Sequence, residues 1–159
     1  MSIFARLGSI KGESRDARHQ DEIDVLSWSW GVSSSGATGH GGGVGGGAGV
    51  GRASFHAFTF THHIDKASPL LMKACATGEH LRDGTVTVRT AGTHPQEHLV
   101  ISMTDLIVTR VSLTVSAEGD SSLEEVVLAF AKVDLEYRAQ KPDGTLEPGI
   151  HFTHDLSTH

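Results

Sequence analysis

Two histidines and a glutamate fall close together in the segment His94-Pro95-Gln96-Glu97-His98. This order matches the inverted zinc-protease pattern, in which both imidazoles bind one zinc ion. The pattern needs a helix, because one helical turn brings both imidazoles onto the same side. Here the flanking segments are strand-like, and residues four apart on an extended strand lie about 13 Å from one another. A metal-dependent hydrolase using His94, Glu97 and His98 is therefore the less favoured interpretation, and we expect no metal site.

The other candidates for chemistry lack the partners that their reactions require. The chain has 11 histidines, but neighbours such as His62 and His63 point to opposite faces of a strand, which makes them poor co-ligands. We expect the histidines to be surface and loop residues. The glycines are not followed by the Lys-Ser or Lys-Thr of a P-loop, and the chain contains no G-x-S-x-G nucleophile elbow. The sequence thus predicts no catalytic residues, no cofactor and a protein that is not an enzyme.

Composition excludes several classes of protein. The formal net charge is −6 and the 13 Lys and Arg residues are scattered singly, so the basic stripe of a nucleic-acid binder is missing. A single cysteine, Cys75, allows no internal disulfide. Residues 1–12 carry no apolar run of signal-peptide or membrane-span length. We expect synthesis in the cytoplasm, no membrane insertion and, if the protein is secreted, export without a signal peptide.

Alternating apolar and polar residues mark strands along most of the chain. We expect strands over residues 3–10, 23–32, 53–62, 85–90, 98–104, 106–116 and 126–138. One short helix is expected over residues 70–77, with Ser68 as its cap, Pro69 at its first position and Gly78 just past its end. The prediction is a single domain, residues 1–159, that is mainly β: an antiparallel β-barrel of two sheets with one flanking α-helix.

The strand predicted over residues 23–32 has two different faces. Its large apolar residues fall on one side: Leu26, Trp28, Trp30 and Val32. Its small residues fall on the other: Ser27, Ser29 and Gly31. The first face suits a hydrophobic core, and the second suits contact with water or with another molecule.

Residues 36–51 interrupt the alternation of apolar and polar residues, because ten of these sixteen residues are glycine. Glycine loses more backbone entropy on ordering than any other residue, and fixing this whole segment would cost on the order of ten kcal/mol or more. We therefore expect a flexible loop that becomes ordered only through an extensive contact.

Several segments, taken together, point to one protein family. They are IKGES at residues 10–14, EIDVLSWSWG at 22–31, the glycine-rich loop, FT at 60–61, IDKASP at 64–69, LM at 71–72, AC at 74–75, VTVR at 86–89, FAKV at 130–133, EY at 136–137 and QK at 140–141, ahead of DG at 143–144. Across about residues 2–145 the chain resembles the haemolysin-coregulated protein (Hcp) family of the bacterial type VI secretion system. The tryptophans Trp28 and Trp30 in their setting are the most specific part of this resemblance.

The resemblance implies a β-barrel that forms homohexameric rings, which stack into a tube inside a contractile sheath. The tube carries a VgrG-type spike protein and small secreted effectors out of the cell, and family members chaperone effectors inside the ring. On this interpretation we hypothesise that Ser27, Ser29 and Gly31 face the lumen and its cargo; the alternative is a solvent face on a monomer. The hypothesised ring-stacking loop comprises Gly39, His40, Gly41, Gly42, Gly43, Val44, Gly45, Gly46 and Gly47.

Two further interpretations stay open beside the hydrolase. A tail-tube subunit of a phage-like contractile particle would share the barrel and the ring assembly, and sequence alone does not separate it from a secretion tube. A monomeric carrier domain would share the barrel without the assembly.

Overall fold

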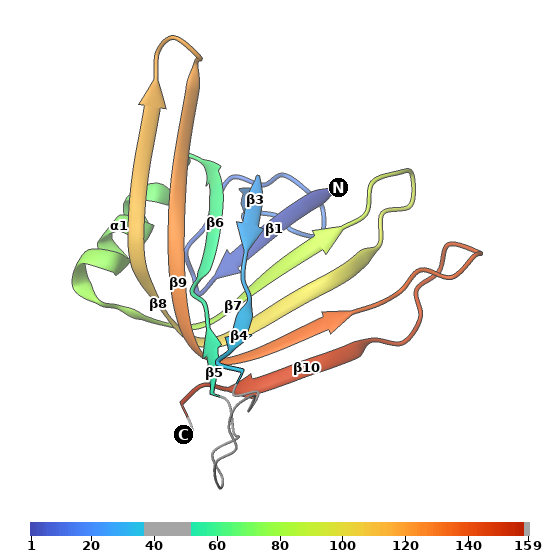
Figure 1. Cartoon of the computed structure of the whole chain (residues 1–159). Helices are drawn as coiled ribbons and strands as arrows, with labels where there is room; N and C mark the ends of the chain where they lie inside the picture. Colours follow the sequence, from blue (N-terminus) through green and yellow to red (C-terminus); the bar gives the residue numbers. More distant parts are fainter. Residues whose placement is uncertain (37–51, 158–159) are drawn as a thin grey trace, which may run out of the picture.

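The computed structural model describes residues 1–36 and 52–157, and its architecture is mainly β with one helix, as predicted (Figure 1). The elements in chain order are β1 (Ser2–Leu7), β2 (Ile23–Val25), β3 (Ser27–Ser29), β4 (Val32–Ser34), β5 (Ala53–Phe55), β6 (Phe58–His63), α1 (Ser68–Thr77), β7 (His80–Arg89), β8 (Glu97–Ser116), β9 (Ser121–Tyr137) and β10 (Ile150–Asp155).

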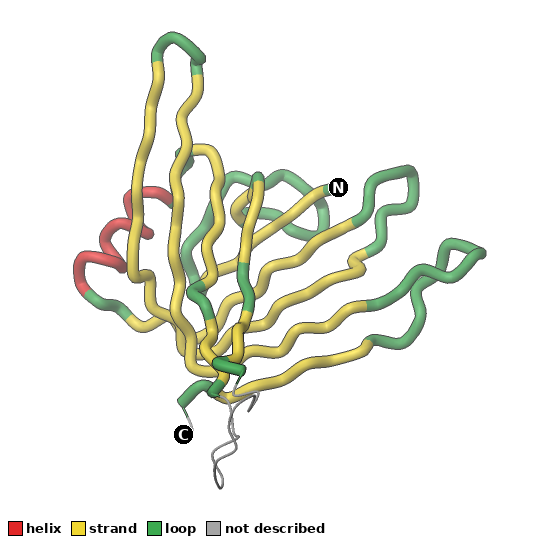
Figure 2. Tube along the Cα trace, in the orientation of Figure 1, coloured by secondary structure: helices red, strands yellow, loops and turns green. Residues whose placement is uncertain are grey.

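Eight of the strands form one antiparallel sheet in the order β2-β1-β7-β8-β9-β6-β3, with β10 also paired to β9. The two short strands β4 and β5 form a separate ribbon. The strands predicted over 85–90 and 98–104 lie within β7 and β8, which pair as an antiparallel hairpin with Val88 opposite Leu99. Figure 2 shows the long strands joined by loops that project at the ends of the sheet.

The sheet curls because its two longest strands change direction halfway along. Met103 and Leu106 of β8 are both buried although three positions separate them, so the side of the strand that faces the core changes between them. Asp105, at the change, has a left-handed backbone with φ 57°. In Figure 1, β8 and β9 run in from one side and then turn upright together. The prediction of separate strands over 98–104 and 106–116 was wrong, because one strand runs through this corner.

The segment 23–29 nearly closes the barrel, because its two halves pair with strands at opposite ends of the sheet. β2 pairs with β1, whereas β3 pairs with β6. The change of partner occurs at Leu26, whose N–H donates to the carbonyl of Thr61 at 2.8 Å. The single predicted strand over 23–32 is therefore three short ones, and Leu26 and Val32 are exposed at 50% and 52% rather than sharing an apolar face with the tryptophans.

The core lies inside the barrel, and α1 packs beside it. The largest buried side chains include Phe58, Phe60, Ile23, Leu71, Ile101, Met103, Leu106 and Leu128. α1 ends at Gly78 as predicted; this glycine has a left-handed φ of 68°, and its N–H points to the carbonyls of Ala74 and Cys75. The predicted Ser68 cap was wrong, since Ser68 is already the first helical residue and its hydroxyl instead accepts a hydrogen bond from the N–H of Asp65.

Candidate cargo-facing surface

Ser27 and Ser29 lie on β3 with exposed side chains, opposite Thr61 and Thr59 of β6. Residues directly opposite one another in an antiparallel pair share a face, so the four hydroxyls form a small polar patch. The hydroxyls of Ser27 and Thr61 are hydrogen-bonded at 2.6 Å. The structure thus brings the two predicted serines together on one outward face.

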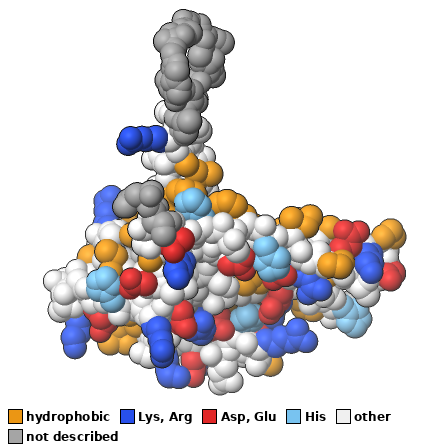
Figure 3. Space-filling view, turned by 90° about the horizontal axis from the view of Figure 1, so that it is seen from below, with side chains coloured by type: hydrophobic (Ala, Val, Ile, Leu, Met, Phe, Trp, Pro, Cys, Tyr) orange, Lys and Arg blue, Asp and Glu red, His pale blue; other side chains and the backbone are white. Residues whose placement is uncertain are grey.

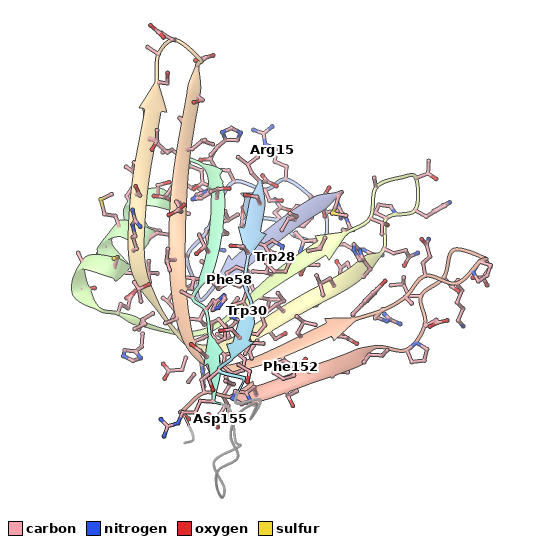
Figure 4. The ribbon with its side chains drawn as sticks, viewed as in Figure 1. Arg15, Trp28, Trp30, Phe58, Phe152 and Asp155 are labelled. Atoms are coloured by element: carbon pink, nitrogen blue, oxygen red, sulfur yellow. The ribbon has the colours of Figure 1, made fainter. Side chains whose placement is uncertain are left out.

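Trp28, on the other face of β3, and Trp30, just after β3, hold this patch in position. The ring of Trp28 stacks on that of Phe58 with centroids 5.3 Å apart, and Trp30 contacts Phe55 and Phe130 at 6.0 and 5.8 Å. Figure 4 shows Trp28, Phe58 and Trp30 one below another on the inner side of the sheet. Because the tryptophans are packed, the backbone of β3 is fixed and its small residues must point outward.

Gly31 does not belong to the same patch. It lies between β3 and β4 rather than in a strand, and its carbonyl accepts a hydrogen bond from the N–H of His56 at 2.8 Å. The alternation that grouped Gly31 with the serines assumed a strand running on to residue 32. β3 ends at Ser29, so that assumption fails.

The serines line a shallow groove of about 200 Å³. Its lining residues are Ser27, Trp28, Ser29, Thr59, Phe60, Thr61 and Glu125. Glu125 comes from β9, where it lies opposite Thr61. The groove therefore offers hydroxyls and one carboxylate, a set suited to hydrogen bonding with polar side chains of another molecule. Thr59, Thr61 and Glu125 were missed from sequence, because only the strand register places them beside β3.

The residues of the zinc-protease pattern do not converge. His94 lies in the loop between β7 and β8, while Glu97 and His98 begin β8. The carboxylate of Glu97 contacts Nε2 of His19 at 2.6 Å, and His98 lies edge-on to the ring of Tyr137. Among residues 1–36 and 52–157, no group of three or more His, Cys, Asp or Glu side chains is arranged to hold a metal ion.

A second hollow, of about 360 Å³, lies beside His94. At its wall Arg89 donates to the carboxylate of Asp16 at 2.6 Å and also lies 4.9 Å from the ring centroid of Phe4. The hydrogen bond from Arg89 lowers the pKa of Asp16 to about 2. These contacts hold the loop between β1 and β2 against the end of β7. Their role is therefore to stabilise the fold.

One histidine contradicts the expectation of surface and loop imidazoles. His62 of β6 is completely buried, with Nε2 2.5 Å from the carboxylate of Glu124, which is also completely buried. A second carboxylate, that of Asp65, lies 3.7 Å from Nδ1. His62 is in phase with Phe58 and Phe60, two and four residues before it, and that phase was the signal available in the sequence.

Figure 3 shows basic and acidic side chains intermixed over the face seen from below. In the part of the chain that the structure describes, no helix combines the length and the apolar character needed to cross a membrane. The hypothesised stacking residues, 39–47, lie outside the described residues.

Comparison with known proteins identifies the family. The model of the family "Type VI secretion system effector, Hcp" matches residues 4–137. Protein hcp1 of Pseudomonas aeruginosa is 41% identical over 150 residues, which cover 94% of this chain and 90% of that protein. The crystal structure of Hcp1 from Salmonella typhimurium is similar with a TM-score of 0.75 and 35% identity, covering 98% of this chain and 94% of that one. A type VI secretion system effector from Yersinia pestis gives a TM-score of 0.76 at 33% identity, covering 96% and 98%. With its barrel, its single helix and the paired tryptophans inside, the chain belongs to the Hcp family of the type VI secretion system.

Proposed function

We propose that this chain is the structural subunit of a type VI secretion tube, in which hexameric rings stack and the patch of Ser27 and Ser29 faces the lumen. The observation that carries the proposal is a strand with two unlike faces, within a chain of the Hcp family. The inner face is packed through Trp28, and the outer face exposes small hydroxyls over a shallow groove. A channel wall requires this combination.

The groove supports a role in carrying effectors. Hydroxyls and the carboxylate of Glu125 bind polar groups reversibly, which suits a cargo that must be released. Partners of the subunit would be other copies of itself, a VgrG-type spike, small effectors and the surrounding sheath. The chain would leave its cell as part of the fired tube.

The mass in solution tests the ring. We expect light scattering to give the mass of a hexamer against 16.9 kDa for one chain, with rings visible by electron microscopy. A protein that stays at the mass of one chain at high concentration would reject the proposal.

Ser29→Lys tests the lumen assignment. A long cation in the groove should leave rings intact and abolish binding of a co-expressed effector. Ser33→Lys, at an exposed position of the ribbon strand β4, is the matched control and should retain the effector. Unchanged retention by the Ser29 variant would contradict the assignment.

Deletion of residues 39–49 tests the stacking loop. Rings should persist because the barrel is untouched, while growth of rings into tubes should be impaired. Normal tubes from this deletion would contradict a stacking role.

A further inference from the structure

The loop between β1 and β2, residues 8–22, places a histidine inside the fold. His19 is only 7% exposed, and its ring stacks on that of Phe4 with the centroids 4.4 Å apart. Phe4 is itself a buried residue of β1. Because so little of the His19 ring reaches water, its two nitrogens need hydrogen-bond partners within the protein.

Both ring nitrogens of His19 lie against carboxylates from different parts of the chain. Nδ1 is 3.0 Å from the carboxylate of Glu22, at the end of the same loop, and Nε2 is 2.6 Å from that of Glu97, the first residue of β8. An ionised carboxylate only accepts hydrogen bonds, and a neutral imidazole has a single N–H to donate. Both contacts can therefore be hydrogen bonds only while the ring carries two protons and a positive charge.

We propose that His19 is a proton-dependent latch: its charged ring holds the loop 8–22 against the start of β8, and the loop is released when the ring loses one proton. Without that proton, one ring nitrogen presents a lone pair to a carboxylate oxygen at hydrogen-bond distance, and the two acceptors repel each other. Histidine suits such a switch, because it is the side chain that ordinarily changes its charge between about pH 5 and pH 8. This inference goes beyond the proposed function and does not depend on ring assembly.

Besides the two carboxylates, the charged groups near this ring form a pair that does not titrate around neutral pH. Arg89 of β7 lies 4.9 Å from the centroid of the Phe4 ring and donates to Asp16 of the loop at 2.6 Å. This hydrogen bond lowers the pKa of Asp16 to about 2, and a guanidinium stays protonated at any ordinary pH. The loop is thus attached to the β7–β8 hairpin at two points, and only the attachment through His19 changes with the proton.

Release of the latch should change the hollow of about 360 Å³ beside His94. One part of its wall is the loop, through residues 16–18, and another is the turn 93–96 between β7 and β8. His19 directly follows the first part in the chain and Glu97 directly follows the second, so their contact ties the two parts together. We expect the hollow to keep its shape while the ring is charged and to widen when it is neutral.

Hydrogen exchange of the loop peptide tests the latch on the whole protein. Backbone hydrogen bonds within the loop, such as those from the N–H groups of Ser14 and Asp21, give it amides whose exchange reports opening. Exchange is measured by mass spectrometry from about pH 5 to pH 9 and expressed relative to an unstructured peptide, which removes the intrinsic effect of pH. Protection should fall by about tenfold as the ring of His19 loses its proton, because a hydrogen bond to a charged group is lost. The NMR signal of the ring C–H of His19 gives the midpoint of that loss.

Two variants separate a latch from a contact that is only structural. Glu97→Gln replaces one carboxylate with an amide, which can accept from a protonated ring nitrogen or donate to an unprotonated one, so the loop should stay protected at both ends of the pH range. His19→Gln has no titrating ring, and protection of its loop should not change with pH. His63→Gln, at an exposed histidine of β6, is the matched control and should respond to pH as the parent does.

Three results would overturn the latch. The first is loop protection in the parent that stays constant while the ring of His19 loses its proton, and the second is a ring that keeps one protonation state over the whole range. The third is an undiminished fall in protection in His19→Gln or Glu97→Gln, which would assign the effect of pH to other groups. None of these results bears on the proposed function, which the mass in solution tests separately.

Discussion

His62 Nε2 lies 2.5 Å from Glu124 Oε1 across the pair of strands β6 and β9, and both side chains are fully buried. Burial opposes a charge on the imidazole, but the carboxylates of Asp65 and Glu124 outweigh it and raise the pKa of His62 to about 9. The core beside the upright hairpin thus contains an imidazolium held between carboxylates. The second atoms of this pair, Nδ1 and Oε2, have no hydrogen-bond partner among the described residues.

Replacing one member of the pair His62 and Glu124 should lower the free energy of unfolding more than replacing both members. His62→Leu leaves the carboxylate of Glu124 buried beside an apolar group, and we expect the free energy of unfolding to fall by about 3–5 kcal/mol. His62→Leu combined with Glu124→Leu should cost less than the single change, since no buried charge is left alone. Urea unfolding measures both. His63→Leu, next door with an exposed side chain, is the control and should change stability by only about 0.5 kcal/mol. Equal losses from the single and double variants would contradict a charged pair.

Stability should fall on the alkaline side of neutrality. His62 binds its proton more tightly when folded, with a pKa of about 9 against 6.5 for an ordinary histidine. Its contribution, roughly 3 kcal/mol, is fully present below pH 6.5 and is lost as the pH rises through 9. Unfolding free energies measured from about pH 6 to pH 10 should decline over that window. The Glu124→Gln variant should decline much less, and an identical decline in both proteins would assign the effect to other groups.

Gly12 should tolerate no side chain. A Cβ at this position would lie 2.6 Å from the carbonyl oxygen of Glu22 and 2.8 Å from the Cα of Ile23, both of them backbone atoms. Gly12→Ala should therefore push β2 away from its place and cost about 1–3 kcal/mol, read from thermal or urea unfolding. Gly119→Ala is the matched control, because a Cβ there meets nothing within 4 Å. A neutral Gly12→Ala would mean that the loop before β2 moves freely.

The ion pair of Asp16 and Arg89 should stabilise the fold at mildly acidic pH and lose this effect at strongly acidic pH. The pKa of Asp16 is lowered from 3.8 to about 2 by its hydrogen bond from Arg89. Its stabilising effect is present above pH 3.8 and is lost as the pH falls through 2. Asp16→Asn should therefore lower the Tm at about pH 5, and the gap from the parent should close by about pH 2. Glu118→Gln, at the exposed hairpin tip, should have the same Tm as the parent at both pH values. If Asp16→Asn lowers the Tm equally at every pH, the loss comes from altered packing or hydrogen bonding and not from the lost charge.

Local pattern was enough to predict the helix and several of the strands, but it divided β8 in two and missed β10. Alternation predicted β6 and most of β7, and Gly78 predicted the end of α1. Alternation failed between residues 23 and 32, because Leu26 fits the local pattern while the chain there changes its partner from β1 to β6. A change of partner is a tertiary event that leaves no local periodicity.

Of the residues in the candidate site, only those that lie together on one strand could be predicted from the sequence. Ser27 and Ser29 lie on the same strand, and their small size beside Trp28 was visible in the sequence. Glu125 lies far along the chain and reaches the groove through the register of β6 and β9. The buried pair of Glu124 and His62 was not predictable, because 62 positions separate the two residues and only the fold brings them together.

The bend at Asp105 has a mechanical consequence. β8 and β9 each pass through it as one strand, and they stay paired from Ser116 at the hairpin tip to Leu99 beside Tyr137, with one register shift between Val108 and Arg110. The two ends of the molecule are thus linked by two continuous backbones rather than by a loop that could act as a hinge. A force applied at one end of the molecule should therefore reach the other end through paired strands, with little bending between them.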